Sequence, residues 1–158
     1  MNNIAVNSSR KLYLCDVGCN APERFLRLHS ALVERLIGQG NEVCSIRDNG
    51  GRDKRLGANL CTCLLTRITN VGAIVAFIDY PSYYTWFEIG QALERKRPVI
   101  VFVEKDRQIG PIPTDILDHY VGTAGQHYLP KYVEYDHQDT GRPFDDQVEE
   151  LLTRINEM

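Results

Sequence analysis

The middle of the chain reads Gly72-Ala-Ile-Val-Ala-Phe-Ile-Asp-Tyr-Pro-Ser-Tyr-Tyr-Thr-Trp-Phe-Glu-Ile-Gly-Gln-Ala-Leu93, and Pro98-Val-Ile-Val-Phe102 follows soon after. An apolar run of strand length ends in Asp79, a short aromatic loop follows, and a helix then carries Glu88 in its first turn. The second apolar run completes a strand–loop–helix–strand unit. Ligands bind to open α/β folds at the carboxyl edge of the parallel sheet, so these two acids are of the greatest interest.

The flanking sequence repeats this alternation of apolar runs and helical stripes. The sequence predicts strands at residues 11–15, 42–46, 73–78, 99–102 and 128–135. It predicts helices after residue 20, at residues 56–68 and about 85–95, and from Pro143 to the end of the chain. Strands that alternate with helices give a mostly parallel sheet, here of about five strands, with helices on both faces.

The first predicted helix has clear boundary signals. Asn20 is the expected N-cap, Pro22 lies in the first turn, and Glu23 stands three residues after the cap. Gly38-Gln-Gly40 is expected to end the helix. Its apolar stripe consists of Phe25, Leu28, Leu32 and Leu36, broadened by Leu26, Val33 and Ile37.

The length and charge of the chain limit its organisation and partners. At 158 residues it can form one domain with a full core, and we expect residues 1–10 to be a short disordered lead to a single domain at 11–158. The formal charge of −3 argues against nucleic acid or an anionic membrane as the main partner, because such binding needs a cationic face. No apolar stretch approaches the roughly 20 residues that cross a bilayer.

The N-terminus and the cysteines indicate the compartment. The first ten residues lack the charged and apolar regions of a signal peptide, which favours a cytoplasmic protein. The five cysteines are odd in number and scattered, which fits a reducing compartment. Neither the cysteines nor the histidines have metal-ligand spacing, so we expect buried free thiols, no metal site and no cofactor. The cysteines are Cys15, Cys19, Cys44, Cys61 and Cys63.

Each of the two central acids has two interpretations. Thr85-x-x-Glu88 is a capping-box pattern, in which the glutamate reaches back to the backbone amide of Thr85. Alternatively, the amides of the first helical turn keep Glu88 anionic, and the anion attacks or supports an oxocarbenium-like sugar carbon. The two interpretations can coexist. Asp79 is either an ordinary turn residue or a catalytic group that orients the ligand or Glu88, or that passes a proton to the leaving base.

The loops beside these acids supply candidate binding residues. The loop Asp16-Val-Gly-Cys-Asn20 leads into a helix N-terminus, where an anion such as phosphate could bind, although its own acid would repel one. The tyrosines that follow the central strand could stack on a nucleobase or stand at the surface. The lone tryptophan could roof the pocket or join the core. The candidate substrate-binding residues are Asp16, Gly18, Ser82, Tyr83 and Trp86.

These motifs resemble the nucleoside 2-deoxyribosyltransferase-like superfamily over about residues 11–103. The resemblance is carried by Leu12-Tyr-Leu14, Ala73-Ile-Val-Ala-Phe-Ile-Asp79 and Thr85-Trp-Phe-Glu-Ile-Gly-Gln-Ala92. The group includes transferases that exchange bases on deoxyribose and hydrolases that cut the N-glycosidic bond of nucleotides. The resemblance implies a flavodoxin-like or Rossmann-like three-layer sandwich in a homodimer or higher homo-oligomer. It also implies that Glu88 is a nucleophile that forms a glycosyl ester, and that Tyr13 hydrogen-bonds it.

The sequence departs from the transferase pattern at two acids. Ser82 stands six residues before the nucleophile, where the transferases carry a second acid, and Cys63 lies near the place of another. Those carboxylates handle the leaving base, so the resemblance supports hydrolysis or binding of a small nucleoside or nucleotide more than base exchange. The first loop also lacks an arginine that some nucleotide hydrolases of the group carry, which weakens the expectation of a 5′-phosphate.

Two other functions remain open from the sequence. A TIR-like domain that cleaves NAD also uses a helix glutamate on a flavodoxin-like sheet, and Ser82-x-x-x-Trp86 is similar to its pattern. A non-catalytic nucleotide-binding module could keep the fold without the acids. Fold alone does not choose among these functions.

Overall fold

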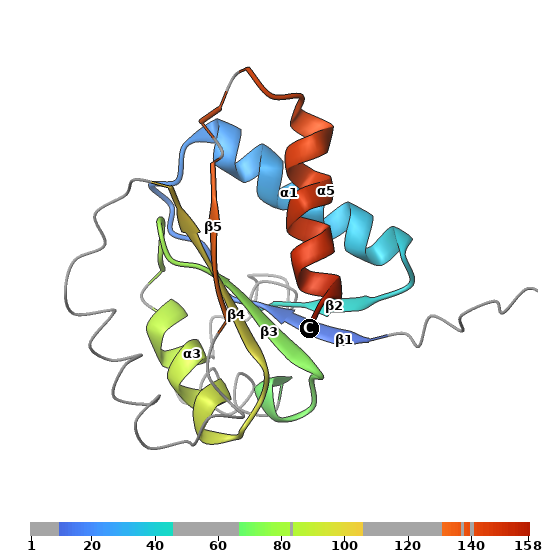
Figure 1. Ribbon diagram of the computed structural model, residues 1–158. Helices are drawn as coiled ribbons and strands as arrows, with labels where there is room; N and C mark the ends of the chain where they lie inside the picture. Colours follow the sequence, from blue (N-terminus) through green and yellow to red (C-terminus); the bar gives the residue numbers. More distant parts are fainter. Residues whose placement is uncertain (1–9, 46–66, 83, 106–130, 137, 140) are drawn as a thin grey trace, which may run out of the picture.

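The computed structural model describes residues 10–45, 67–82, 84–105, 131–136, 138–139 and 141–158. Within these ranges the chain forms five strands and three named helices (Figure 1). The strands are β1 (Lys11–Leu14), β2 (Glu42–Cys44), β3 (Ala73–Phe77), β4 (Val99–Glu104) and β5 (Lys131–Tyr135). The helices are α1 (Glu23–Gly38), α3 (Thr85–Glu94) and α5 (Phe144–Asn156).

The five strands form one parallel sheet in the order β2-β1-β3-β4-β5. The pairing register places Tyr13 of β1 beside Ile74 of β3, and Ile74 in turn beside Val99 of β4. This order confirms the predicted α/β class and is that of a flavodoxin-like sheet. The chain runs from β1 outward to β2, and then from β3 outward to β4 and β5. The direction of winding therefore reverses between β1 and β3, which is where such sheets open a crevice.

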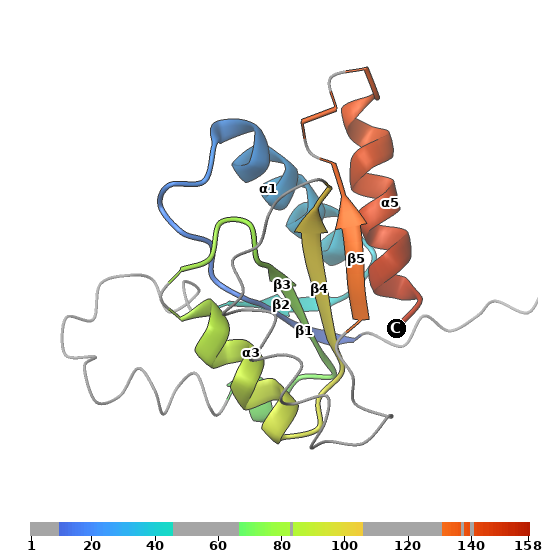
Figure 2. The ribbon, with the colours of Figure 1, turned by 60° about the vertical axis from the view of Figure 1, so that its left-hand side comes forward.

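Helices cover both faces of the sheet, as the alternation in the sequence predicts. Helices α1 and α5 lie on one face and α3 lies on the other, and the rotated view shows the same three layers (Figures 1 and 2). Side chains of β1 alternate between the two faces: Leu12 and Leu14 join the core under α1 and α5, whereas Tyr13 and Cys15 join the core under α3. This alternation aims Tyr13 and Cys15 at α3.

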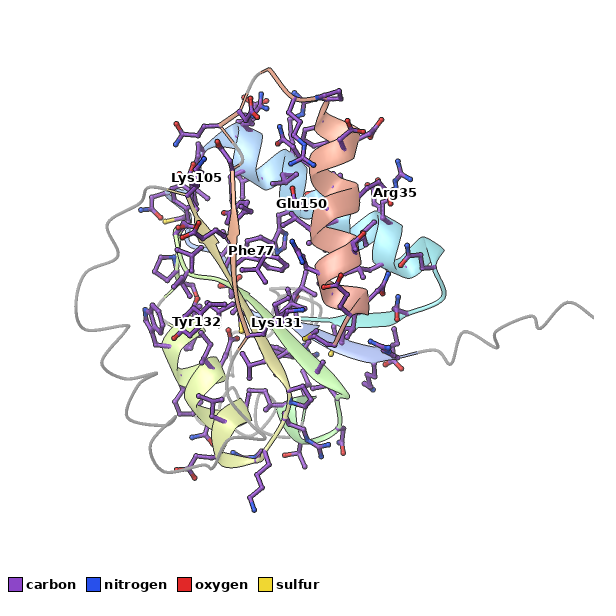
Figure 3. The ribbon with its side chains drawn as sticks, viewed as in Figure 1. Arg35, Phe77, Lys105, Lys131, Tyr132 and Glu150 are labelled. Atoms are coloured by element: carbon purple, nitrogen blue, oxygen red, sulfur yellow. The ribbon has the colours of Figure 1, made fainter. Side chains whose placement is uncertain are left out.

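The core under α1 and α5 is built around Phe77 of β3, which lies between the sheet and these helices (Figure 3). Its ring stacks on Phe102 at 4.9 Å between centroids and meets the edges of Phe25 and Tyr135 at 5.4 and 5.5 Å. Aromatic pairs at these distances add to the stabilisation that comes from burial. The cluster joins β3, β4, β5 and α1, and so fixes the strands that carry the loops of the crevice.

Two expectations for α1 are wrong. The helix begins at Glu23 with Pro22 at the N-cap position, so Asn20 is not its cap. The predicted stripe from Phe25 to Leu36 is fully buried, but Leu26 and Ile37 are exposed, so the buried face is narrower than the sequence suggested. The strongest contacts of α1 in the described ranges are with α5 and β2, and they bury the stripe from Phe25 to Leu36.

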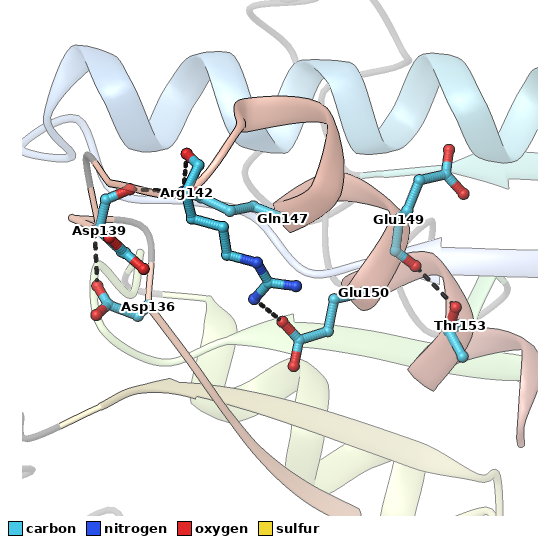
Figure 4. Close-up of polar contacts among 7 residues, drawn as sticks. All are labelled: Asp136, Asp139, Arg142, Gln147, Glu149, Glu150 and Thr153. Atoms are coloured by element: carbon cyan, nitrogen blue, oxygen red, sulfur yellow. Dashed lines mark hydrogen bonds and ion pairs between the residues drawn. The ribbon is translucent and has the colours of Figure 1, made fainter.

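The connection from β5 to α5 is held by its own polar groups (Figure 4). The carboxylate of Asp136 accepts a hydrogen bond from the amide of Asp139 at 3.0 Å, and the carbonyl of Asp139 accepts one from the side chain of Gln147 at 2.7 Å. Arg142 forms an ion pair with Glu150. These contacts set the start of α5 right after Pro143, as predicted.

Several expectations fall on residues outside the described ranges. These are the lead at 1–9, nearly all of the helix at 56–68, the first three residues of the last strand, and Tyr83. None of the helices that the structure describes is both long and apolar enough to pass through a membrane.

Candidate functional site

The loops that follow β1 and β3 lie against each other where the winding of the sheet reverses. Val17 forms an isolated bridge with Pro81, and the amide of Gly18 donates to the carbonyl of Tyr80 at 2.7 Å. A side chain on Gly18 would meet the carbonyl oxygen of Pro81 and the side chain of Asn20, both at 2.8 Å from its Cβ. Glycine is therefore required at this position, because it lets the two loops touch.

A cavity of about 640 Å³ opens between these two loops. This volume lies within the range of small-molecule sites, which is about 300–1,000 Å³. The loop after β1 and the start of α3 form the wall. The described residues that line it are Asp16, Val17, Gly18, Cys19, Asn20, Pro81, Ser82, Tyr84 and Trp86.

The carboxylate of Glu88 lies at the junction of α3 and β1, fully buried at 0% exposure. The hydroxyl of Tyr13 donates to its Oε1 at 2.6 Å, and the backbone amide of Asp16 donates to its Oε2 at 3.1 Å. The thiol of Cys15 also hydrogen-bonds the carboxylate. Three positions within four residues of the chain, at 13, 15 and 16, thus supply donors to one acid on the facing helix.

Burial and hydrogen bonding act on this acid in opposite directions. Burial raises the pKa of Glu88, since the charged form is poorly solvated there, while the hydrogen bonds from Tyr13, Asp16 and Cys15 lower it and leave a net increase. Burial and the neighbouring carboxylate raise the pKa of Tyr13 far above its usual range, and the pKa of the Cys15 thiol is raised as well. The phenol and the thiol therefore stay protonated and act as donors to Glu88.

The capping-box interpretation of Thr85 and Glu88 is wrong. Helix α3 already includes Thr85, and no side chain caps it. The hydroxyl of Thr85 accepts a hydrogen bond from the amide of Ser82 at 2.8 Å and donates to the carbonyl of Asp16 at 2.8 Å. Glu88 therefore does not cap the N-terminus of α3, and its carboxylate points to β1.

Asp79 lies at the same edge of the sheet but has different partners. Both of its carboxylate oxygens accept from the amide of Glu104, at 3.0 and 2.9 Å, and the hydroxyl of Tyr135 donates to Oδ2 at 2.8 Å. It is 3% exposed. These contacts tie the end of β3 to β4 and β5, and they do not bring Asp79 to Tyr13 and Glu88.

The structure brings most of the other predicted residues to one place. Asp16, Gly18, Ser82 and Trp86 line the cavity, and Trp86 also packs against the core under α3. Glu88 does not belong to the described lining, although its partner Asp16 does.

Sequence reasoning missed two side chains of the site, Cys15 and Thr85. The alternation of side chains along β1 could have placed Cys15 beside Tyr13. Thr85 was considered only as a helix cap, although its place one helical turn before Glu88 puts both side chains on the same face of α3.

No group of histidine, cysteine or acidic side chains in the described ranges could hold a metal ion. Cys15, Cys19 and Cys44 are free thiols.

Comparisons with known proteins agree with the architecture. No protein-family model matches the chain, and no curated protein sequence matches it. Among solved structures, a CMP N-glycosidase from Clostridium botulinum aligns with a TM-score of 0.55 and 16% identity over 90% of this chain and 98% of its own. A 2-deoxyribosyltransferase from Bacillus psychrosaccharolyticus aligns with a TM-score of 0.55 and 21% identity, over 87% of this chain and 95% of its own. A conserved protein from Enterococcus faecalis V583 aligns with a TM-score of 0.55 and 18% identity, over 93% of this chain and 99% of its own.

The alignments span nearly the whole of each structure, which identifies the fold in spite of the low identity. The chain has the nucleoside 2-deoxyribosyltransferase-like fold.

Proposed function

We propose that this protein cleaves the N-glycosidic bond of a nucleoside or nucleotide, with Glu88 as the nucleophile. One observation carries the proposal. A buried carboxylate accepts hydrogen bonds from the Tyr13 hydroxyl at 2.6 Å and from a backbone amide at 3.1 Å, at the place where the winding of the sheet reverses. The similar structures of a CMP N-glycosidase and a 2-deoxyribosyltransferase support this class of reaction.

The chemistry proceeds in two displacements. A carboxylate oxygen of Glu88 attacks the anomeric carbon, the bond from that carbon to the base nitrogen breaks, and the base leaves with the electron pair. Water then attacks the same carbon of the glycosyl ester, and the carboxylate leaves. One proton of the water goes to the departed base and the hydroxyl stays on the sugar. The two carboxylate oxygens have four lone pairs, so the bonds from Tyr13, Asp16 and Cys15 leave one for attack.

The geometry sets a condition on this reaction. Glu88 is fully buried, and Asp16, which lines the cavity, binds its carboxylate through the backbone amide. A sugar in the cavity must therefore reach Glu88 beside Asp16, whose amide stays bound to the carboxylate at 3.1 Å.

Hydrolysis is favoured over base exchange. Asp16 is the only acid among the described residues that line the cavity, and Ser82 stands where a transferase would carry a second one. Without a second carboxylate to bind an incoming base and take its proton, water is the natural acceptor.

The burial of Glu88 also favours a second candidate function, the binding of a nucleotide without turnover. A carboxylate whose two oxygens are both occupied by donors of the same chain could serve only to join α3 to β1. In that case a ligand would occupy the cavity and no base would be released.

One experiment separates these functions. The protein is incubated with nucleosides, their 5′-monophosphates and NAD, with and without a second free base, and released base or nicotinamide is measured by chromatography. Glu88→Gln should abolish release, while Glu94→Gln, which changes an exposed acid at the far end of the same helix, should not. Release from NAD alone would support the TIR-like activity, and equal release by Glu88→Gln would refute the nucleophile.

The assembly implied by the resemblance, a homodimer or higher homo-oligomer, stays a prediction. Sedimentation or light scattering of the intact chain would test it.

A further inference from the structure

Thr85 is fully buried one turn before Glu88, and its hydroxyl has a fixed polarity. The amide of Ser82 can only donate, so the Thr85 oxygen accepts that bond at 2.8 Å. Its single proton then goes to the carbonyl of Asp16, also at 2.8 Å. The hydroxyl of Ser82 lies farther away, at 3.3 Å.

Two side chains on one face of α3 therefore hold the backbone of one residue. Glu88 accepts from the amide of Asp16 at 3.1 Å, and Thr85 donates to its carbonyl at 2.8 Å. Residues three apart on a helix project from the same side, so the spacing of the two contacts is set by the helix itself. Asp16 lies two residues after the end of β1, so the same contacts help to fix where the side chains of Tyr13 and Glu88 meet.

We propose that Thr85 is a positioning residue, whose hydroxyl fixes the backbone of Asp16 so that the Asp16 amide orients the reactive carboxylate of Glu88. The inference rests on the proposed function, in which Glu88 attacks the sugar. Thr85 acts through Asp16, because its hydroxyl is taken up by the amide of Ser82 and the carbonyl of Asp16.

The role predicts a titration that a purely structural threonine would not change. Among the described residues, the titratable groups that face Glu88 are Tyr13 and Cys15 on β1 and Asp16 in the loop. The amide of Asp16 lowers the pKa of Glu88. If the carbonyl of Asp16 loses the Thr85 hydroxyl as its donor, the hydrogen bond from the Asp16 amide to Glu88 weakens. The pKa of Glu88 then rises further.

The test compares Thr85→Val, which has the same shape without the hydroxyl, with Thr85→Ser, which keeps the hydroxyl. The pKa of Glu88 is read by carbon-13 NMR of labelled glutamate carboxyls, with the signal assigned by its absence from Glu88→Gln. This reading needs no turnover, so it tests Thr85 even if no substrate is ever cleaved. Thr153→Val, which removes an exposed hydroxyl that donates to Glu149, is the matched control.

We expect the pKa of Glu88 to rise in Thr85→Val and to stay at the wild-type value in Thr85→Ser and Thr153→Val. Where a substrate is cleaved, kcat at acidic pH should fall roughly tenfold in Thr85→Val, the effect of losing about one hydrogen bond to a charged group, with KM little changed. Thr85→Ala removes the same hydroxyl with less bulk and replaces Thr85→Val if that variant does not fold.

Two results from the Thr85 variants alone would overturn the proposal. One is an unchanged or lowered pKa of Glu88 in folded Thr85→Val or Thr85→Ala. The other is a fall in kcat with no movement of the pKa, which would make Thr85 merely structural. Repeating the titration with Asp16→Asn, which keeps the amide and removes the charge, separates the backbone contact from the charge of the Asp16 side chain. If Thr85→Val still raises the pKa of Glu88 in the Asp16→Asn background, the proposal is supported. If that rise vanishes, the proposal is overturned.

Discussion

Two buried carboxylates lie at the carboxyl edge of the sheet with the same kinds of donors. Glu88 accepts from the hydroxyl of Tyr13 at 2.6 Å and from a backbone amide at 3.1 Å. Asp79 accepts from the hydroxyl of Tyr135 at 2.8 Å and from a backbone amide at 2.9 and 3.0 Å. By burial and by hydrogen bonding the two acids are nearly alike.

The difference lies in what carries the donors. The amide that binds Asp79 belongs to Glu104 of β4, and its tyrosine stands on β5, so this acid fastens strands of the sheet. The amide that binds Glu88 belongs to Asp16, a loop residue that lines the cavity. A buried, well-bonded acid is therefore not a sign of a site by itself, whereas contact with a cavity-lining loop is.

The largest difference should appear in catalysis. Glu88→Gln should lower base release by at least about a thousandfold, the usual consequence of removing a nucleophile. Glutamine has nearly the same shape, can accept from the Asp16 amide and can donate to Tyr13, so the variant should still fold. Chromatography of released base measures the loss, and circular dichroism checks the fold. Release within tenfold of wild type would remove the distinction between the two acids.

Asp79 should show its role in stability. Asp79→Ala leaves the amide of Glu104 and the hydroxyl of Tyr135 without their buried partner, and should lower the free energy of unfolding by about 2–4 kcal/mol. Urea titration measures this. The rate per folded molecule should stay within about twofold of wild type, and its loss in a well-folded variant would place Asp79 in the reaction.

The two tyrosines form a matched pair. Tyr13→Phe removes a donor that lowers the pKa of Glu88, so this pKa should rise. The acid limb of the pH–rate profile should then move to higher pH, with roughly tenfold less activity on that limb. Tyr135→Phe should leave the profile in place and lower the free energy of unfolding by about 1–2 kcal/mol. Identical profiles for the two variants would show that Tyr13 does not act on Glu88.

The smallest effect concerns the pH dependence of stability. Burial raises the pKa of Glu88 above the usual 4.5, so the folded state binds its proton more tightly than the unfolded state. Ionised Glu88 therefore destabilises the fold at neutral pH, and wild type gains stability as pH falls through the raised pKa toward 4.5. Glu88→Gln carries no ionisable group here and lacks this destabilisation. Its free energy of unfolding should therefore exceed that of wild type most near pH 7, and the difference should shrink toward pH 4.5. Urea titrations across this range test the trend, and an advantage that grows on acidification would contradict it.

The sequence predicted the elements that bury long apolar runs. Residues 73–77 and 99–102 could only be interior strands, and the stripe from Phe25 to Leu36 could only be an amphipathic helix. The end of β4 was predicted two residues short, because the acid Glu104 looks like a boundary although it is buried at 6% exposure. Its amide pairs with Asp79, and that long-range contact leaves no mark in the local sequence.

The candidate site was predictable only in part. Glu88 was identified from its place in the first turn of a helix after a buried strand, and Tyr13 through the family resemblance; the structure brings the two together. The role of Asp16 could not be predicted, because its contact to Glu88 uses a backbone amide that every residue except proline carries. The capping-box prediction failed for a related reason: a pattern of four residues cannot show that β1 and the loop after it offer Glu88 better donors than its own helix does.

Trp86 is the only tryptophan of the chain, and it stands in the wall of the cavity. Ultraviolet emission excited at the indole band therefore comes from one ring at one known place, with no background from other tryptophans. A solute that enters the cavity would alter the intensity or colour of that emission directly. The protein thus carries a built-in optical reporter of occupancy, which can rank compounds before any reaction is known.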